Sequence, residues 1–398
     1  MAKLRVTRSV QIPDLLRLHR YRKAPELGPR ILFFSGGTAL NGLCQSLKKY
    51  THNSIHLVTP FDSGGSSATL RRAFQMPAIG DVRSRLMALA DDTVLGHPEV
   101  FQLFNHRFPM DQPQATLLQN LSDLAAGKSS LIADINNPMR QLIRHQLGYF
   151  MDAMPDDFDL RGASIGNLIL AGGYLNNHNH MDPIVFLFSK LVSVQGTVRV
   201  VVNKNLHLGA HLEDGSCILE QHRLTGKEVN PIHSPIKQLF LSQSATDVLP
   251  AEVSLRKKNR KLIESADLIC FPPGSFYSSL MANLLPNGVG SAIHQNCCPK
   301  VFIPNLGTDP EQLGMNFFHM LNSLLDQLKL DLHKPSENNE LIGYVLIDRK
   351  NGQYPFALPD DKAMEALGIT VINTRLISQA SAPYYDNELL VAALLSLC

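Results

Sequence analysis

Short apolar runs alternate with helical patterns along most of the chain. ILFF (31–34) precedes a glycine pair and then Leu40, Leu43 and Leu47, which recur at helical spacing. SIHLVTP (54–60) likewise precedes a glycine- and serine-rich loop and the helix start ATLRRAF (68–74). Further strands are predicted at VQGTVRVVV (194–202), ADLICFPP (266–273), KVFIPNL (300–306) and GYVLID (343–348). Because parallel strands need crossover connections, the pattern predicts an α/β fold with a mainly parallel sheet and helices on both faces.

Two segments interrupt this alternation. Residues 1–29 are rich in Arg and Leu and are predicted to be an N-terminal extension, with one α/β domain over 30–398. Residues from about 91 to 160 show apolar positions three and four apart, as in MRQLIRHQLGYFMDAM (139–154), and are predicted to form a helical insertion. The length of 398 residues leaves one large domain or two open. Glu213-Asp214-Gly215, between two apolar runs, predicts a hairpin turn.

Composition narrows the classes of partner. The formal net charge of +2 gives no field that would gather nucleic acid or an anionic membrane. The first residues lack the apolar stretch of a signal peptide, and no segment approaches the roughly 20 apolar residues of a membrane helix, so we expect a cytoplasmic protein. The six cysteines show no CxxC spacing, which favours reduced, mostly buried thiols; they are Cys44, Cys217, Cys270, Cys297, Cys298 and Cys398.

The first candidate phosphate loop is Ser35-Gly36-Gly37-Thr38, where an apolar strand passes into a helix. Glycine lets backbone amides approach a phosphate at a helix N-terminus, so Gly36, Gly37 and Thr38 are candidate ligand-binding residues. The loop matches neither GxxxxGK[ST] nor a full GxGxxG, and a glycine pair after a strand is often only a turn.

The second candidate loop adds a carboxylate to small donors, in the order Asp62-Ser63-Gly64-Gly65-Ser66-Ser67. Asp62 could hold Mg²⁺ or a ligand hydroxyl, and Ser66 and Ser67 could bind phosphate or cap the next helix. The alternative is a loop whose side chains satisfy their own amides. Because both loops follow parallel strands, they are predicted at the carboxyl edge of the sheet, where open α/β folds bind ligands.

Two further groups are candidates for ligand contact. Arg71, Arg83 and Asp81 follow the second loop, and arginine suits phosphate through bidentate hydrogen bonds, although an Asp-Arg pair is also a common structural ion pair. A third strand ends in a glycine- and hydroxyl-rich segment that contains Gly274, Ser275 and Tyr277.

Two kinds of chemistry are disfavoured by the sequence. His178 and His180 have metal-like H-x-H spacing but no third ligand in the sequence, which favours a polar loop. Ser275 lacks a G-x-S-x-G elbow and an assignable base, which disfavours a covalent hydrolase.

Four segments together resemble the CofD-type family, which includes 2-phospho-L-lactate transferases and YvcK-like gluconeogenesis factors. They are SGGTALNGLCQSLKKY (35–50), VTPFDSGGSSATLRRAFQMPAIGDVRSRLMALAD (58–91), GASIGNLILAG (162–172) and ADLICFPPGSFYSSLMANLLPNGV (266–289). The resemblance implies a Rossmann-like three-layer α/β/α sandwich, and family habit implies a homodimer. It also implies one of two functions. The transferases move a phospho-lactyl group from a guanosine diphosphate-linked donor to a deazaflavin hydroxyl with Mg²⁺, whereas the YvcK-like branch resembles nucleotide-sugar-binding regulators of carbon metabolism and cell shape.

The resemblance also implies roles for particular residues. Gly36, Gly37, Thr38, Gly274 and Ser275 would contact nucleotide phosphates, Asp62 would stand at the acceptor or metal position, and Asn167 would line the same cleft. Two positions depart from the family pattern. Ala39 replaces a glycine of the first loop, and Ser63 replaces a second aspartate, which removes a candidate metal ligand or base. Two hypotheses follow: a transferase with Asp62 as its catalytic residue, or a non-catalytic nucleotide-sugar sensor.

Overall fold

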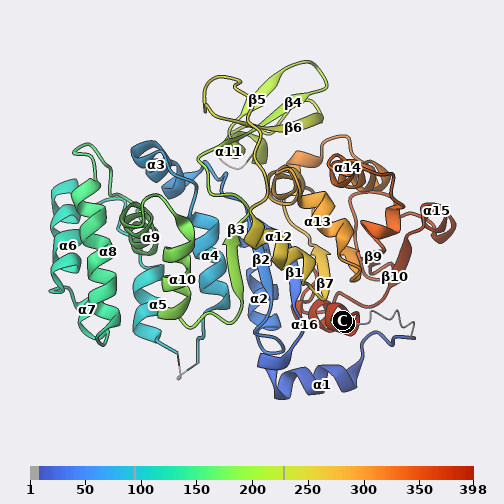
Figure 1. The fold of residues 1–398 in the computed structure, drawn as a ribbon, viewed down its shortest axis with the longest axis horizontal. Coiled ribbons are helices and arrows are strands. Elements are labelled where there is room, and N and C mark those ends of the chain that lie inside the picture. Colours follow the sequence, from blue (N-terminus) through green and yellow to red (C-terminus); the bar gives the residue numbers. More distant parts are fainter. Residues whose placement is uncertain (1–8, 94–95, 227–228) are drawn as a thin grey trace.

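The centre of the molecule is a seven-stranded sheet in which every strand pairing is parallel (Figure 1). The computed structural model describes residues 9–93, 96–226 and 229–398. The strand order is β10-β9-β8-β7-β1-β2-β3. These strands are β1 (Ile31–Ser35), β2 (Ile55–Val58), β3 (Thr197–Val200), β7 (Leu268–Phe271), β8 (Lys300–Phe302), β9 (Tyr344–Ile347) and β10 (Thr370–Asn373).

Helices cover both faces of this sheet and form a separate group beside β3 (Figure 1). Those in the first half of the chain are α1 (Leu15–Lys23), α2 (Asn41–Leu47), α3 (Gly65–Phe74), α4 (Gly80–Leu89), α5 (Pro98–Asn105), α6 (Gln114–Ala126), α7 (Ser130–Ala133), α8 (Met139–Ala153), α9 (Ile165–Asn176) and α10 (Met181–Leu191). The later ones are α11 (Gln221–Thr225), α12 (Lys257–Glu264), α13 (Val289–Gln295), α14 (Phe317–Lys329), α15 (Asp361–Ala366) and α16 (Asn387–Ser396). Short helical turns also occur, among them Phe276–Leu280 and Met281–Leu284.

The two faces of β1 belong to two different cores, because successive side chains of a strand point to opposite faces. Phe33 packs into the core formed with α2, α4, α9 and α16, whereas Phe34 packs into the core formed with α12, α13 and α14. Both phenylalanines are fully buried, and Phe34 stacks on Phe271 of β7 with ring centroids 5.8 Å apart. Because β1 is buried on both faces, its sequence is the continuous apolar run ILFF. The packing of helices on both faces of the sheet confirms the three-layer α/β/α prediction.

The strand order reverses between β1 and β7. From β1 the chain moves outward through β2 to β3, and then returns to β7 on the other side of β1 and moves outward through β8, β9 and β10. Such a reversal opens a crevice outside the carboxyl ends of the two central strands, where α/β proteins of this type bind ligands. The loops after β1 and β7 are the glycine-rich segments at Gly36 and Gly274.

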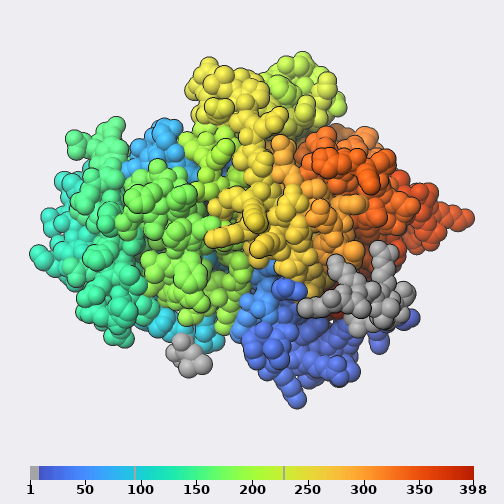
Figure 2. All heavy atoms as spheres, viewed as in Figure 1, coloured from blue at the N-terminus to red at the C-terminus, as the bar shows by residue number. Residues whose placement is uncertain are grey.

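A second, antiparallel sheet was not predicted as a separate unit. Its order is β5-β4-β6, formed by β4 (His207–Leu212), β5 (Cys217–Leu219) and β6 (Ile236–Ser242). The predicted hairpin turn is confirmed: β4 and β5 pair antiparallel, and Gly215 has a φ of 86°. This unit projects from the body of the molecule (Figure 2) and carries α11 at its base.

The helical character of the region after residue 91 is confirmed by α5 to α8, although its status as an insertion stays a prediction. In the N-terminal segment, α1 packs on α16 through Arg17, whose Nη1 donates to the carbonyl oxygens of Ser396 and Cys398.

His178 and His180 lie in the loop between α9 and α10. Within the described residues, no helix combines the length and apolar character needed to cross a bilayer.

The prediction of mostly buried thiols is only partly right. All six cysteines are free, but Cys44 and Cys270 alone are buried, and Cys217 and Cys297 are exposed. Both exposed cysteines occupy peripheral positions in the fold: Cys217 begins an edge strand, and Cys297 lies in the loop before β8.

Candidate functional site

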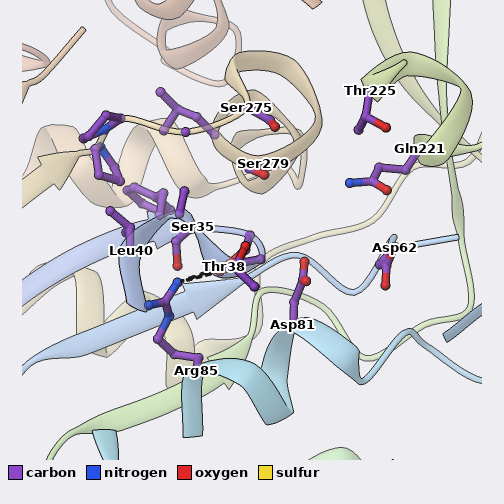
Figure 3. Close-up of a pocket in the computed structure, with 18 of the residues that line it drawn as sticks. Ser35, Thr38, Leu40, Asp62, Asp81, Arg85, Gln221, Thr225, Ser275 and Ser279 are labelled. Carbon is purple, nitrogen blue, oxygen red and sulfur yellow. Dashed lines mark hydrogen bonds between the residues drawn. The ribbon is translucent and has the colours of Figure 1, made fainter. Parts of the chain in front are cut away.

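A cavity of about 300 Å³ lies at the carboxyl edge of the sheet, at the point where the strand order reverses (Figure 3). Its walls come from the loops after β1, β2 and β7, from the start of α4 and from α11. The lining residues are Phe34, Ser35, Gly36, Gly37, Thr38, Ala39, Leu40, Asp62, Gly64, Asp81, Arg85, Gln221, His222, Thr225, Pro272, Pro273, Gly274, Ser275, Ser279 and Leu280. Three candidate segments that are far apart in sequence therefore meet at one cavity.

The loop after β1 is held from below by Arg85 of α4, which is fully buried. Its Nη2 donates to the carbonyl oxygens of Gly36 (3.2 Å) and Gly37 (3.0 Å). In a trans peptide the N–H points opposite to the C=O, so the amides of Gly37 and Thr38 point away from the guanidinium. Backbone amides in this orientation beside a buried cation favour binding of an anion.

Arg85 is itself fixed by a buried polar chain. Its Nη1 contacts Cys44 Sγ at 2.9 Å, and Cys44 Sγ lies 3.9 Å from His56 Nδ1. Burial lowers the pKa of His56 well below its ordinary value, with a smaller contribution from Arg85, and burial raises the pKa of the Cys44 thiol. Both groups are therefore neutral near pH 7, and the charge in this part of the core belongs to Arg85.

The loops after β1 and β7 approach each other closely. A Cβ at Gly36 would collide with the side chain of Ser279, and one at Gly37 would lie 3.1 Å from Asp81 Oδ1. Asn283 Nδ2 bridges the two segments by donating to the carbonyl oxygens of Ser35 (2.9 Å) and Ser279 (2.8 Å). Glycine is thus required at position 36 for backbone proximity.

Two carboxylates, those of Asp62 and Asp81, line the cavity where the loop after β2 and the start of α4 form its wall (Figure 3). Asp62, in the loop after β2, accepts a hydrogen bond from the amide of Gly64 at 3.1 Å. Asp81, in the first turn of α4, lies beside Gly37, and Thr59 Oγ1 donates to it at 3.5 Å. Carboxylates accept hydrogen bonds from hydroxyl groups and also coordinate hard cations.

Ser63 connects the loop after β2 to the antiparallel unit. Its Oγ accepts a hydrogen bond from the backbone N–H of His222 (3.0 Å) and lies 2.9 Å from His222 Nδ1. The side chain is buried, so it supports α11 and does not line the cavity. The serine at the position of the family's second aspartate therefore has a structural partner in this chain.

The loop after β7 is supported by the loop after β8. Gly274, with a φ of 148°, donates to Asn305 Oδ1 and accepts from Asn305 Nδ2, both at 2.7 Å. The helical turn that follows is capped by two carboxylates. Asp309 accepts from the amide of Phe276 (2.8 Å), and Glu311 accepts from those of Tyr277 (2.9 Å) and Ser278 (2.7 Å). A phosphate near Gly274 would therefore not reach these three amides.

Glu311 should make stability depend on pH. Burial first, and the charge of Asp309 second, raise its pKa from 4.5 to about 7. The folded protein then binds this proton more tightly than the unfolded chain, so the contribution to stability is full below about pH 4.5 and is lost as the pH rises to about 7. In Glu311→Gln the free energy of unfolding, measured by urea denaturation, should therefore change less over this pH range than it does in the wild-type protein. Equal slopes in the two proteins would contradict the assigned shift.

Several sequence-predicted residues lie outside the cavity lining, and their contact with a ligand stays a prediction. Arg71 is buried and donates to the carbonyl oxygens of Phe61 and Leu206. Arg83 donates to the carbonyl oxygen of Phe104, and burial lowers its pKa to about 10. The others are Gly65, Ser66, Ser67, Asn167 and Tyr277.

These outlying residues mostly have structural partners. Asn167 Nδ2 donates to Ser66 Oγ at 3.2 Å, while its buried Oδ1 has no hydrogen-bond partner among the described residues. Tyr277 is buried, and its hydroxyl donates to the carbonyl oxygen of Ile236 at 3.4 Å. Burial raises the pKa of Tyr277 to about 12, so this hydroxyl stays protonated.

Sequence reasoning missed the wall that α11 provides. Gln221, His222 and Thr225 line the cavity, but QHRLT (221–225) follows a hairpin and not a strand of the parallel sheet. Ser279 and Arg85 also line it, and the sequence does not distinguish them from the neighbouring serines and arginines. Among the described residues, no group of three or more His, Cys, Asp or Glu is arranged to hold a metal ion.

The fold and these loops define a Rossmann-type α/β protein with a ligand cavity at its switch point, and comparison with known proteins is more specific. The family model for 2-phospho-L-lactate transferase CofD matches residues 31–377, and this chain belongs to the CofD family. The resemblance inferred from the sequence is thus confirmed.

Relatives include two proteins named gluconeogenesis factor, each 30% identical to this chain. The one from Bacillus subtilis (strain 168) matches over 283 residues, 71% of this chain and 69% of the relative. The one from Halalkalibacterium halodurans matches over 350 residues, 86% of this chain and 88% of the relative. A crystal structure of a UPF0052 family protein from Bacillus halodurans has a TM-score of 0.67 and 24% identity, covering 92% of this chain and 99% of that chain, and supports the fold.

Proposed function

We propose that this protein is a regulator that binds a nucleotide-linked sugar in the cavity and does not turn it over. The relatives named gluconeogenesis factor favour this branch of the family over the transferases. The observation that carries the proposal is the composition of the cavity, which combines glycine loops with two carboxylates.

The two sides of the cavity suit two parts of one ligand. Amides of the loop after β1, with Arg85 beneath them, suit the phosphates. Asp62 and Asp81, with Gln221 and Thr225, suit hydroxyl groups, which donate to carboxylates and amides. A sugar linked to a nucleoside through a pyrophosphate carries both kinds of group.

Ser63 supports binding without turnover. Catalysis by the transferases would profit from a second carboxylate beside Asp62 as base or metal ligand, and here the corresponding hydroxyl is engaged with His222. Binding requires only the glycine loops and the hydroxyl-facing groups.

A divalent cation fits this proposal as part of the bound ligand. Mg²⁺ is commonly held by one or two protein carboxylates together with phosphate oxygens, and Asp62 and Asp81 line the cavity. The cation would offset repulsion between the phosphates and these carboxylates. Its presence, a cytoplasmic location and a homodimer remain proposals.

The test is calorimetric titration with UDP-glucose, GDP-glucose and the matching nucleoside diphosphates, with and without Mg²⁺. We expect one nucleotide-linked sugar to bind and to be recovered intact by chromatography after prolonged incubation with Mg²⁺. Release of a nucleoside monophosphate or transfer of a group to an added deazaflavin would restore the transferase hypothesis. Failure of every nucleotide-linked compound to bind would overturn the proposal.

Asp81→Asn should weaken binding of the nucleotide-linked sugar by roughly tenfold or more, because hydrogen bonds to a charged group contribute about 1.5–3 kcal/mol. In the absence of Mg²⁺ the same change should not weaken binding of the nucleoside diphosphate alone, because it removes repulsion between Asp81 and the phosphates. Asp152→Asn is the control, since Asp152 is exposed on α8 and lies outside the cavity lining. Equal losses for both ligands in Asp81→Asn would remove Asp81 from the sugar-binding side.

A further inference from the structure

A second cavity, of about 520 Å³, adjoins the first across the loops after β1 and β7. It lies between these loops, the loop after β8 and the start of α16. Its lining residues are Ala39, Leu40, Gly42, Leu43, Pro273, Gly274, Ser275, Asn305, Leu306, Gly307, Thr308, Asp309, Pro310, Tyr384, Tyr385, Asn387 and Leu390. Ala39, Leu40, Pro273, Gly274 and Ser275 line both cavities, so a single ligand can extend from one into the other.

The boundary between the two cavities is formed by Ala39 and Gly274, which line both. A Cβ built at Gly274 would lie 3.6 Å from the Cβ of Ala39. The two loops therefore lie close together here and form a ridge between the cavities. The phosphate-binding candidates Gly36, Gly37 and Ser275 stand beside this boundary.

The second cavity differs in chemistry from the first. Leu40, Leu43 and Leu306 form apolar walls, and Tyr384 presents an aromatic ring that is 66% exposed. A tyrosine ring offers a flat aromatic face, and aromatic rings favour stacked partners. The ring lies over Gly307, where a Cβ would approach Tyr384 Cε1 to 4.0 Å. The absence of a side chain at Gly307 leaves the loop after β8 flat beneath the tyrosine.

An amide side chain supplies hydrogen-bonding capacity at the rim. Asn387, the first residue of α16, is exposed and lies against Gly42, where a Cβ would come within 2.5 Å of its Nδ2. An amide offers both donors and an acceptor, as the edge of a nucleobase requires. The first cavity, by contrast, contains the carboxylates of Asp62 and Asp81, which suit hydroxyl groups.

We propose that the second cavity binds the base of the nucleotide-linked ligand, with the base stacked on Tyr384. The pyrophosphate then lies over the ridge formed by Ala39 and Gly274, and the sugar enters the first cavity beside α11. This inference rests on the proposed function and fixes the direction in which the ligand lies.

The test compares Tyr384→Ala and Tyr384→Phe with the wild-type protein. The ligands are UDP, GDP and ADP, the corresponding nucleotide-linked glucose, and glucose 1-phosphate, which has no base. Because stacking of a base on an aromatic side chain is substantial, Tyr384→Ala should weaken the best-binding nucleoside diphosphate by about tenfold or more. Tyr384→Phe keeps the ring and should retain the affinity. Binding of glucose 1-phosphate should be the same in all three proteins.

The outcomes separate this inference from the proposed function. Unchanged affinity for the nucleoside diphosphate in Tyr384→Ala, with wild-type binding intact, overturns the position of the base alone. Failure of the wild-type protein to bind any nucleotide overturns both proposals. Tyr149→Ala is the control, since Tyr149 is 47% exposed on α8 and lies outside both cavity linings.

Discussion

Arg85→Met should lower the affinity for a phosphate-containing ligand by about 30-fold or more, because charge-assisted hydrogen bonds and the orientation they impose contribute about 2–3 kcal/mol. The guanidinium fixes the carbonyl oxygens of Gly36 and Gly37, and the acceptors named above are all neutral. Its Nε has no hydrogen-bond partner among the described residues. The positive charge in this core is therefore available to an anion above the loop.

Arg85→Lys separates the two contributions of this residue. It keeps the charge but cannot span both carbonyl oxygens, so it should bind more tightly than Arg85→Met and less tightly than wild type. Arg161→Met serves as the control, because Arg161 pairs with Asp159 on the exposed surface. Calorimetric titration gives the affinities, and wild-type affinity in Arg85→Met would show that the loop binds no anion through this support.

Gly172→Ala should lower the free energy of unfolding by about 2–4 kcal/mol, since overpacking forces packed backbones apart. Gly172 lies on α9 where this helix crosses α8, and its Cβ would run into the carbonyl oxygen of Gln146. A backbone atom of a neighbouring helix cannot rotate aside as a flexible side chain can. Urea denaturation measures the loss.

Gly148→Ala is the matched comparison, because it introduces the same methyl group on α8. Apart from its chain neighbours and its own helix backbone, no atom of the described residues lies within 4 Å of a Cβ at Gly148, so alanine should stabilise the helix by up to about 1 kcal/mol. If both variants lose stability equally, the contact between α8 and α9 is not as close as described.

Local patterns were sufficient to predict the strands that position the site. Each of β1, β2 and β7 is a fully buried run that ends at a glycine-rich loop, and both signals lie within a few residues. The meeting of these loops at one edge followed from the parallel arrangement. What local patterns could not supply was contact over long sequence distances. Ser63 and His222 are 159 residues apart, so neither the position of α11 nor the structural use of Ser63 is visible in the sequence.

Side-chain direction was the other limit of sequence reasoning. Arg71 and Arg85 stand in the same arginine-rich stretch and look alike in the sequence. In the fold, Arg71 points to the carbonyl oxygens of Phe61 and Leu206, and Arg85 lies under the loop after β1. An arginine supports the site only if its helix turns that side chain toward the loop after β1. The orientation of α3 and α4 relative to the sheet is fixed only when these helices pack.

The carboxylates of Asp309 and Glu311 make the two halves of the Rossmann sheet differ in their attraction for a negatively charged ligand. They neutralise the helical turn after β7, so that half offers an incoming ligand a fixed shape with little attraction for negative charge. The half that contains β1 has Arg85 and the outward-facing amides, together with the carboxylates of Asp62 and Asp81. Under the proposed function, affinity and selectivity should therefore change independently: substitutions around β1 should alter how strongly a phosphate is held, and substitutions around β7 and β8 should alter what may be attached to it.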